Sequence, residues 1–462
     1  DGLSIYDVQT KEYKLLLPEE TDAFSLSDKF IYPIVKDREG GIWIATYYGG
    51  INYLSPNANQ FESYSYSSYK NSVSGNVISR FCEDMQGNIW IGSDDGGLSK
   101  YNPRTGIFSE YKAQNGNNSL SYDNVHALCM DGNNLWIGTY TGGVNVLDTH
   151  TGKFKLYLSD KNKKNTLDDN SIYAIFNDKD KNIWVTTMTG VNRYNRKTDD
   201  FTRMKEFGFM TMDIIQDSHG NLWFATEGKG LFKYNINRNV WKNYTKGNMP
   251  YSLSCNMIND LLIDGQNRLW IATDEGLYIY NDRKDNFQPI SLNIPSQSIT
   301  GLAESGTSLW ITTLHGLIHY YPETKKLEIY TKSDGLRSDQ FIPASIVHTS
   351  IGEIFIGSVA GFNAFFPNNI KANKYIAPIV INGLEASGIS IPLMDKTINL
   401  SYKENVLTFK FASLSYCTPE KNQYAYMLEG FDKTWNYVGN QNRAIYTNLP
   451  SGTYSFKVKG SN

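Results

Sequence analysis

Side chains that bind polar ligands stand beside short glycine-containing turns throughout this chain. Carboxylates, Arg and His hydrogen-bond to hydroxyl groups, and Tyr rings pack against the apolar faces of sugars. This mixture favours a surface that binds an oligosaccharide, although an acidic residue beside a turn glycine can also serve only to cap the turn. The candidate ligand-binding residues are Tyr47, Tyr48, Asp94, Asp95, Tyr122, Tyr140, Glu227, Lys229, Asp274, Glu275, His315 and Arg337.

The chain carries no recognisable catalytic, metal-binding or cofactor-binding motif. Residues 178–182 resemble a calcium loop, but the Gly at the sixth position and the Glu at the twelfth are missing. We predict a hairpin turn there instead. His315 and His319 lie four apart in a predicted strand, a spacing that does not form a metal pair. We therefore expect no catalytic residue, no metal and no cofactor in this region.

One repeated block positions the candidate residues. In its second copy, residues 84–93 read Asp-Met-Gln-Gly-Asn-Ile-Trp-Ile-Gly-Ser. The block recurs about every 45 residues, a period that indicates a propeller, a solenoid or another repeat array. Its central aromatic residue is predicted to lie in the core, because it repeats with the fold. The copies are Trp43, Trp90, Trp136, Trp184, Trp223, Trp270, Trp310 and, with Phe in place of Trp, Phe355.

Each repeat is predicted to form four antiparallel strands, named A to D here. Strand A alternates as in residues 125–129, and strand B carries the Trp. Strand C follows a Gly turn, as in residues 143–147, and strand D has a Phe-x-x-Tyr pattern, as in residues 154–157. Four strands in 40–50 residues are typical of a propeller blade, and the period of two argues against helices. Since strands alternate in direction, the B–C turns and D–A connections lie on one face, where we expect the ligand.

The eighth copy lacks a strand D of its own, so another segment must complete its sheet and remove the open edge. Residues 60–64 are one donor and give a seven-bladed propeller. Residues 13–17 are the other and give eight blades. With the first donor, residues 1–57 become the tail of an upstream propeller and residues 58–372 the seven-bladed propeller.

Residues 373–462 lose the repeat and show strict alternation, as in residues 405–411, with aromatic pairs and Pro-Ser-Gly turns. This pattern predicts an immunoglobulin-like β-sandwich that stops one or two strands early. The Tyr-rich string of residues 424–458 resembles the Y-Y-Y domain, and the Gly-Asn-Ile-Trp-Ile-Gly block resembles the regulator-propeller repeat. Together, in this order, they resemble the periplasmic sensor region of the hybrid two-component regulators of gut Bacteroides.

That resemblance implies two seven-bladed propellers, a Y-Y-Y domain, one membrane-spanning helix, and cytoplasmic kinase, receiver and DNA-binding domains. It implies a periplasmic region of an inner-membrane protein that senses oligosaccharides, controls polysaccharide-utilisation genes and forms a homodimer through its C-terminal domain. The chain starts within a predicted repeat and ends within a strand-rich segment, so we expect the helix and the histidine kinase to lie outside it. The kinase activity would then belong to the whole protein and not to this region.

Composition limits the alternatives. The net charge is −3 and no basic stripe is present, so nucleic acid is not an expected partner. The sequence contains no run of 18 apolar residues, which is about the length that a membrane-spanning helix needs. Two other functions stay open: a propeller lyase or glycosidase, which needs an acid–base pair at the channel mouth, and a protein-binding scaffold, which needs an exposed apolar patch.

Overall fold

The computed structural model describes residues 2–19, 24–56, 60–67, 71–114, 116, 118–206, 210–248, 251–371, 375–393, 397–417 and 419–461. These residues form an all-β fold, as predicted, with three short 3-10 helices: η1 (Lys332–Asp334), η2 (Pro367–Asn369) and η3 (Pro419–Lys421). The chain divides into two compact units, residues 60–370 and residues 1–59 with 371–462. The predicted domain boundaries fall at 57–59 and 372–374, outside the described residues.

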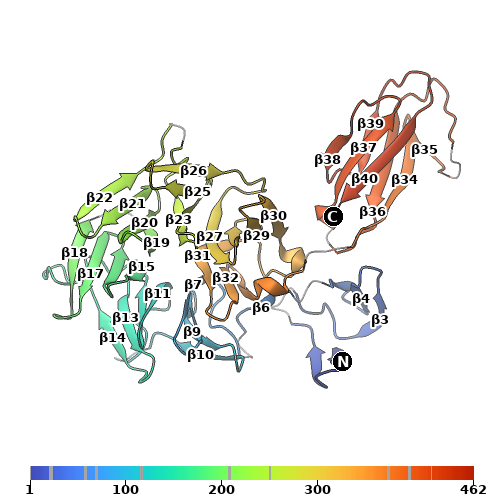
Figure 1. Ribbon diagram of the computed structural model, residues 1–462. Coiled ribbons are helices and arrows are strands. Elements are labelled where there is room, and N and C mark those ends of the chain that lie inside the picture. Colours follow the sequence, from blue (N-terminus) through green and yellow to red (C-terminus); the bar gives the residue numbers. More distant parts are fainter. Residues whose placement is uncertain are drawn as a thin grey trace. The chain divides into compact units, whose positions relative to one another are not determined.

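The described part of residues 60–370 forms seven four-stranded sheets arranged radially around a common centre (Figure 1). All neighbouring strands within a sheet are antiparallel, in the predicted A-to-D order. The sheets are β7 (Ile78–Glu83), β8 (Ile89–Ser93), β9 (Gly97–Asn102), β10 (Ile107–Tyr111); β11 (Val125–Asp131), β12 (Asn134–Thr139), β13 (Gly143–Asp148), β14 (Phe154–Tyr157); β15 (Ile172–Asn177), β16 (Ile183–Thr187), β17 (Gly190–Asn195), β18 (Asp200–Glu206); β19 (Thr211–Gln216), β20 (Asn221–Thr226), β21 (Leu231–Asn235), β22 (Val240–Tyr244); β23 (Ile258–Ile263), β24 (Leu269–Thr273), β25 (Gly276–Asn281), β26 (Asn286–Ile290); β27 (Ile299–Ser305), β28 (Ser308–Thr313), β29 (Gly316–Tyr321), β30 (Lys326–Tyr330); β31 (Phe341–His348), β32 (Ile354–Ser358), β33 (Gly361–Phe365) and β6 (Glu62–Tyr64).

The last sheet of this unit is completed by a strand from its beginning. β6 pairs with β33, with Tyr64 opposite Phe362, and the two rings stack with centroids 4.5 Å apart. The innermost strands contact one another in the order β7, β11, β15, β19, β23, β27, β31, and β31 contacts β7 in turn. Residues 13–16, the other donor that the sequence offered, form β2 and pair with β1 instead. The ring is therefore closed by the segment at residues 62–64.

The recurring Trp is held by the recurring Asp six residues before it. Asp84 accepts the backbone N–H of Asn88 (2.9 Å) through Oδ1 and the indole N–H of Trp90 (3.0 Å) through Oδ2. The turn between them needs a left-handed residue, which is Gly87 in this blade (φ 77°). In the predicted hairpin turn at residues 178–182, Asp178 binds Trp184 in the same way, at 2.9 Å, so this segment is a turn as expected.

Three blades depart from this pattern. In the last sheet Phe355 replaces the Trp, and Thr349 stands six residues before it. Among the described residues, the buried indole N–H groups of Trp136 and Trp310 have no hydrogen-bond partner. Their A–B turns are shorter, so no Asp stands six residues before either Trp. Trp310 instead stacks on His319, with ring centroids 4.0 Å apart. The Trp core was predicted correctly, since Trp90, Trp136, Trp184, Trp223, Trp270 and Trp310 are at most 3% exposed.

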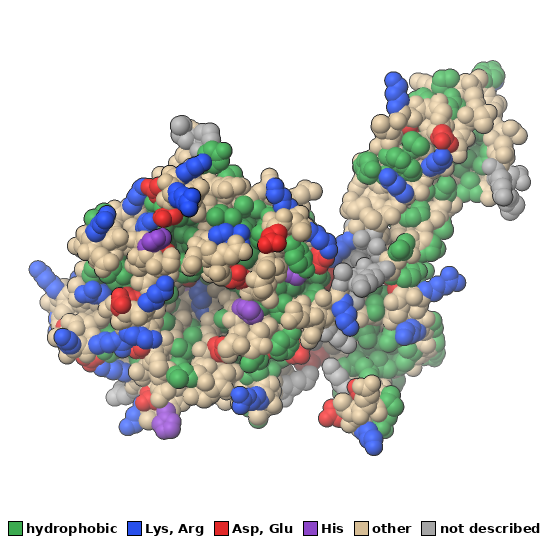
Figure 2. Space-filling model, viewed as in Figure 1, with side chains coloured by type: hydrophobic (Ala, Val, Ile, Leu, Met, Phe, Trp, Pro, Cys, Tyr) green, Lys and Arg blue, Asp and Glu red, His purple; other side chains and the backbone are tan. Residues whose placement is uncertain are grey.

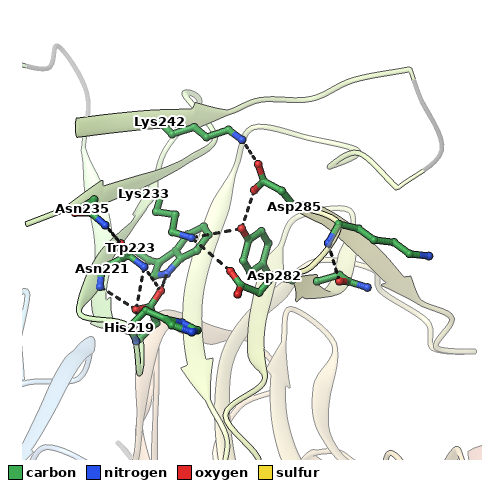
Figure 3. Close-up of polar contacts among 12 residues, drawn as sticks. His219, Asn221, Trp223, Lys233, Asn235, Lys242, Asp282 and Asp285 are labelled. Atoms are coloured by element: carbon green, nitrogen blue, oxygen red, sulfur yellow. Dashed lines mark hydrogen bonds and ion pairs between the residues drawn. The ribbon is translucent and has the colours of Figure 1, made fainter. Parts of the chain in front are cut away.

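Neighbouring blades are also joined near their outer strands. Figure 3 shows this contact between the sheet of Trp223 and the next sheet: Lys233 pairs with Asp282 (3.7 Å), and Lys242 pairs with Asp285. The hydroxyl of Tyr280 also donates to Asp285, at 2.7 Å. These residues are largely exposed, so the ion pairs contribute little individually. The buried cores between blades supply most of the stabilisation.

The other unit contains a hairpin, a three-stranded sheet and a β-sandwich. The sandwich pairs the sheet β35-β34-β36-β39 with the sheet β38-β37-β40 around Phe411, Tyr424 and Tyr446, consistent with the predicted immunoglobulin-like fold. Trp43 of the three-stranded sheet is only half-buried, unlike the recurring Trp residues of the seven four-stranded sheets. The strands are β1 (Leu3–Tyr6), β2 (Tyr13–Leu16), β3 (Ile31–Lys36), β4 (Ile42–Thr46), β5 (Ile51–Leu54), β34 (Ile379–Ala386), β35 (Ile389–Ile391), β36 (Leu407–Ser413), β37 (Gln423–Glu429), β38 (Asn436–Gly439), β39 (Arg443–Tyr446) and β40 (Ser455–Ser461).

Replacing Asp84 by Ala is predicted to lower the free energy of unfolding by about 3 kcal/mol, because it leaves buried donors unpaired. Urea unfolding followed by Trp fluorescence measures the change. The matched control is Ser305→Ala, in a turn whose Trp310 indole already lacks a partner, and it should cost less than about 0.5 kcal/mol. Equal, small losses in both variants would show that the Asp–Trp bond does not stabilise the blades.

Candidate functional site

A cavity of about 210 Å³ opens where several inner strands of residues 60–370 begin. It is small beside ordinary ligand pockets of roughly 300–1,000 Å³ and matches one end of a larger ligand. Its walls combine carboxylates, an imidazole, a phenol and apolar side chains. The lining residues are Ser79, Arg80, Asp94, His126, Tyr173, Met210, Thr211, Met212, Glu227, Ile342 and Pro343.

Part of the lining comes from a β-bulge that recurs in the inner strands. The pairing of β7 with β8 skips one residue between Ile78 and Arg80, and the same shift occurs in β11, β15, β19, β23 and β27. A bulge re-aims the side chain of its extra residue. We call these extra residues the bulge ring, and four of them line the cavity. The bulge ring is Ser79, His126, Tyr173, Met212, Asn259 and Thr300.

A second set of equivalent residues follows strand B in five blades. The backbone N–H of Asp94 donates to the carbonyl of Val77 (2.9 Å), and the N–H of Glu227 donates to that of Met210 (3.0 Å). The same bond fixes the other members, which we call the turn ring: Asp94, Tyr140, Met188, Glu227 and Asp274. The B–C turns and the connections into strand A therefore lie on one face, as the sequence predicted.

The two rings contact each other. Tyr140 lies beside His126, with ring centroids 5.7 Å apart, and Asp274 accepts the side-chain amide of Asn259 (2.8 Å). Asp94 Oδ1 lies 3.7 Å from His126 Nε2, too far for a hydrogen bond. Within the described residues, neither Asp94 Oδ1 nor His126 Nδ1 has a hydrogen-bond partner, although both atoms are buried. Unsatisfied buried polar atoms at a cavity wall suit hydrogen bonds to a ligand.

Burial sets the charge of this pair. It raises the pKa of Asp94 to about 6, against the opposing pull of the Arg80 charge. Burial, helped by the same positive charge, lowers the pKa of His126 to about 4. At neutral pH the pair is therefore a carboxylate beside a neutral imidazole, which together accept and donate hydrogen bonds.

Arg80 forms the floor of the cavity with the irregular strand β31. Its guanidinium donates to the carbonyls of Met212 and Pro343, both at 2.6 Å, and to that of Ser79 at 2.8 Å. β31 pairs with β32 at Phe341 and then again from Ile346 onward. Ala344, between these two residues, has a left-handed φ of 53°. This bulged segment contacts β19 and β23 as well as its own sheet.

Two further carboxyls lie near Arg80. Burial raises the pKa of Asp213 to about 6, while the Arg80 charge opposes the shift. Burial and then the neighbouring Asp213 charge raise the pKa of Asp260 well above its usual range. Asp260 also accepts the backbone N–H of Leu302, at 2.7 Å. Since two such carboxyls resist ionising together, the pair holds a proton at mildly acidic pH.

The structure brings only some of the predicted site residues together. Asp94 and Glu227 line the cavity, Tyr140 contacts His126, and Asp274 holds Asn259. Asp95 caps its turn by accepting the N–H groups of Asn76 and Val77. The buried Arg337 donates to the Ala360 carbonyl (3.1 Å), which is a structural contact. The remaining candidates do not line the cavity: Tyr122, Lys229, Glu275 and His315 are exposed turn or connection residues, and Tyr47 and Tyr48 belong to the other unit.

The bulge ring was missed because strand A was interpreted only as a core strand. A signal was present: the second residue of strand A differs in each repeat, whereas the first is almost always a branched apolar residue or Thr. No group of three His, Cys, Asp or Glu that could hold a metal occurs in the described residues. Those residues also contain no helix long and apolar enough to cross a bilayer.

Comparisons with known proteins identify the modules. The family described as "Two component regulator propeller" matches residues 25–48, 72–95, 119–141, 166–189, 207–228 and 252–275, and the Y_Y_Y domain matches residues 415–462. The extracellular domain of a hybrid two-component system from B. thetaiotaomicron superposes with a TM-score of 0.82 at 26% identity, covering 99% of this chain and 62% of that chain.

Two other proteins are also similar to this chain. A second extracellular domain from B. thetaiotaomicron has a TM-score of 0.58 and 24% identity, covering 99% of this chain and 64% of that one. Histidine kinase P4 from Formosa agariphila is 24% identical, covering 66% of this chain and 27% of the kinase. The chain thus spans less than two thirds of each relative.

The fold and these matches define the class: an extracellular region of a two-component sensor. More particularly, the chain carries regulator-propeller repeats followed by a Y_Y_Y domain, as the resemblance in its sequence predicted. The similarity to extracellular domains is consistent with a periplasmic location. The matches to sensor extracellular domains are consistent with a kinase domain that lies outside this region.

The buried carboxyls predict a pH dependence of stability. A carboxyl whose pKa is raised by folding contributes stability at low pH that is lost as the pH rises through the folded pKa. The free energy of unfolding should therefore fall between about pH 4 and pH 7, with Asp213 and Asp260 contributing. Asp213→Asn should make the free energy of unfolding less dependent on pH. The change removes one carboxyl whose pKa is raised by folding, and it removes the neighbouring charge that raises the pKa of Asp260. Urea titrations at several pH values test it, and parallel wild-type and variant curves would refute the coupling.

Proposed function

We propose that this chain is the ligand-sensing region of a hybrid two-component sensor kinase and response regulator, and that it binds a glycan-derived oligosaccharide in the cavity. The observation that carries the proposal is that two buried atoms, Asp94 Oδ1 and His126 Nδ1, have no hydrogen-bond partner within the described residues at the wall of a cavity built from two rings of non-repeating residues. In the whole protein, binding is transmitted across the membrane to control polysaccharide-utilisation genes. Signalling then requires that the ligand bind one of two receptor states more tightly.

The charged side chains form no strongly basic surface. Lys and Arg as well as Asp and Glu side chains are scattered over the face drawn in Figure 2, and the net charge of the chain is −3. Such a surface gives little long-range attraction to a polyanion such as nucleic acid. Specificity must then come from the groups inside the cavity.

We further propose that residues 1–57 are the end of an upstream propeller. In the part of this segment that the structure describes, the sheet β3-β4-β5 has three strands, and it exposes Tyr32 (56%), Val35 (58%) and Ile51 (70%). Large apolar side chains at such exposure suit burial against a neighbouring blade. A strand from the start of that propeller would complete the sheet in the way that β6 completes the sheet of β33.

One observation suits the enzyme alternative. Two carboxyl groups, Asp94 and Glu227, line the same cavity, and burial places the pKa of Asp94 near 6. A lyase or glycosidase needs such a pair at the channel mouth. The binding experiment below therefore includes an assay for turnover.

Isothermal titration calorimetry with a panel of oligosaccharides tests the sensor proposal. We expect binding with no change in the sugar, as checked by chromatography after the titration. His126→Ala should weaken binding at least about tenfold, because it removes a cavity wall and a hydrogen-bonding group. Glu323→Gln, in an exposed turn between β29 and β30, is the control and should bind as wild type. Chain cleavage would support the enzyme, and silence across the panel would favour the scaffold.

We also propose that the sensor is a homodimer through its C-terminal domain. That domain exposes Tyr437 (76%) and Ile445 (56%), which could contribute to a dimer contact. Light scattering of the chain at increasing concentration should show a mass rising towards a dimer, and the double change Tyr437→Ser with Ile445→Ser should lower it. A monomer at all concentrations would contradict dimerisation by this region.

A further inference from the structure

The polar atoms left open to the cavity are mainly acceptors. Asp94 Oδ1 has no partner within the described residues. Glu227, half-buried on the equivalent turn three blades later, lines the same cavity. Carboxylates accept hydrogen bonds and cannot donate them when ionised. They therefore suit a ligand rich in donors, such as a sugar with free hydroxyl groups.

The one cationic side chain in the lining is already used. Arg80 donates to three backbone carbonyls, of Ser79, Met212 and Pro343. Three carboxyl groups, those of Asp213, Asp260 and Asp94, also stabilise the positive charge of the Arg80 guanidinium. An anionic group of a ligand would have to displace these bonds to pair with Arg80, and the carbonyls so freed would lose their partner.

The other hydrogen-bond donors in the wall, which include the hydroxyl groups of Ser79 and Thr211, carry no charge. His126 is neutral at physiological pH, since burial keeps its pKa near 4. Tyr173 donates its hydroxyl to the Sδ atom of Met188, at 3.4 Å. An anion entering this cavity would thus meet two carboxylates and no available positive charge. Repulsion between like charges at short range in a partly buried site is costly.

Four apolar side chains also line the cavity. Met210, Met212, Ile342 and Pro343 share the wall with Tyr173 and with the hydroxyl residues Ser79 and Thr211. Thioether and aliphatic groups of this kind pack against the C–H face of a sugar ring, and Tyr adds an aromatic surface. The cavity therefore offers acceptors for hydroxyl groups together with an apolar wall for the ring itself.

From these contacts we propose that the cavity takes an uncharged, hydroxyl-bearing sugar unit, whose hydroxyl groups donate to Asp94 and Glu227, and that it rejects uronic and sulfated units. This inference rests on the proposed function and names the class of ligand for the same site. Under this proposal, neutral glycan fragments fit the cavity and acidic glycan fragments do not.

A matched pair of ligands tests the inference. Calorimetry on the whole chain first screens neutral tetrasaccharides of glucose, mannose, galactose, xylose and arabinose, together with tetragalacturonic acid and a heparin-derived tetrasaccharide. The neutral hexose binder is then compared with the same sugar oxidised at C6 to the uronate, which differs only by its carboxylates. If the neutral binder is a pentose oligomer, the acidic tetrasaccharides of the screen are the comparison. We expect the acidic form to bind at least about tenfold more weakly.

Two variants assign the effect to the carboxylates. Asp94→Asn should weaken the binding of the neutral sugar about tenfold or more, because a charged hydrogen-bond acceptor is lost. The double change Asp94→Asn with Glu227→Gln should narrow the gap between the neutral and acidic sugars. Glu323→Gln, on an exposed turn, should change neither affinity. Thermal melts of each variant check that the propeller stays folded.

The outcomes separate the two proposals. If an acidic sugar binds as tightly as any neutral one, or if Asp94→Asn leaves neutral binding unchanged, the inference about ligand class is overturned while the sensor proposal stands. If no oligosaccharide of either class binds, the proposed function fails and the inference fails with it.

Discussion

Every other feature of this protein depends on the burial of each propeller sheet between two neighbours. The core clusters of residues 60–370 consist of side chains from adjacent sheets, as where Trp223 and Leu231 pack with Ile258 and Ile271. A sheet with two apolar faces cannot remain at the end of a row, so the row must close. Closure occurs where Tyr64 of β6 stacks on Phe362 of β33, and this sheet then packs with Ile78 and Ile89 of the first one.

This closed ring separates residues that must repeat from residues that are free to vary. Asp84 and Trp90 show the first kind: in four of the seven sheets the Asp accepts the buried indole N–H of the Trp six residues later. The bulge ring and the turn ring show the second kind. Their backbone is fixed by the same pairing in each blade, while their side chains change from Ser to His to Tyr to Met. A rigid repeat thus presents a non-repeating surface at the channel mouth.

The sequence predicted the fold closely because its signals are local and repeated. The Trp period, the left-handed turn position at Gly87 and the alternation of strand A each report on a few neighbouring residues. The choice between residues 13–17 and residues 60–64 for the last strand was left open, since it depends on contacts about 300 residues apart along the chain.

The site was predicted in part. The B–C turns were identified, and Asp94 and Glu227 do line the cavity, but Tyr47 and Tyr48 lie in the other unit. His126 and Tyr173 were missed because strand A was interpreted only as a core strand, although its second residue differs in each repeat. Arg80, which directly follows the bulge in β7, was missed as well. Asp213 and Asp260 were missed for a different reason: they belong to neighbouring blades, and only the closed ring brings them near Arg80.

The central claim is that a ligand binds at the channel mouth between the bulge ring and the turn ring. A crystal structure of the chain with its tightest-binding oligosaccharide tests this most directly. The account predicts density for one sugar unit within hydrogen-bonding distance of Asp94 and His126. Density on the exposed Tyr47 and Tyr48, or elsewhere with the cavity unchanged, would contradict it.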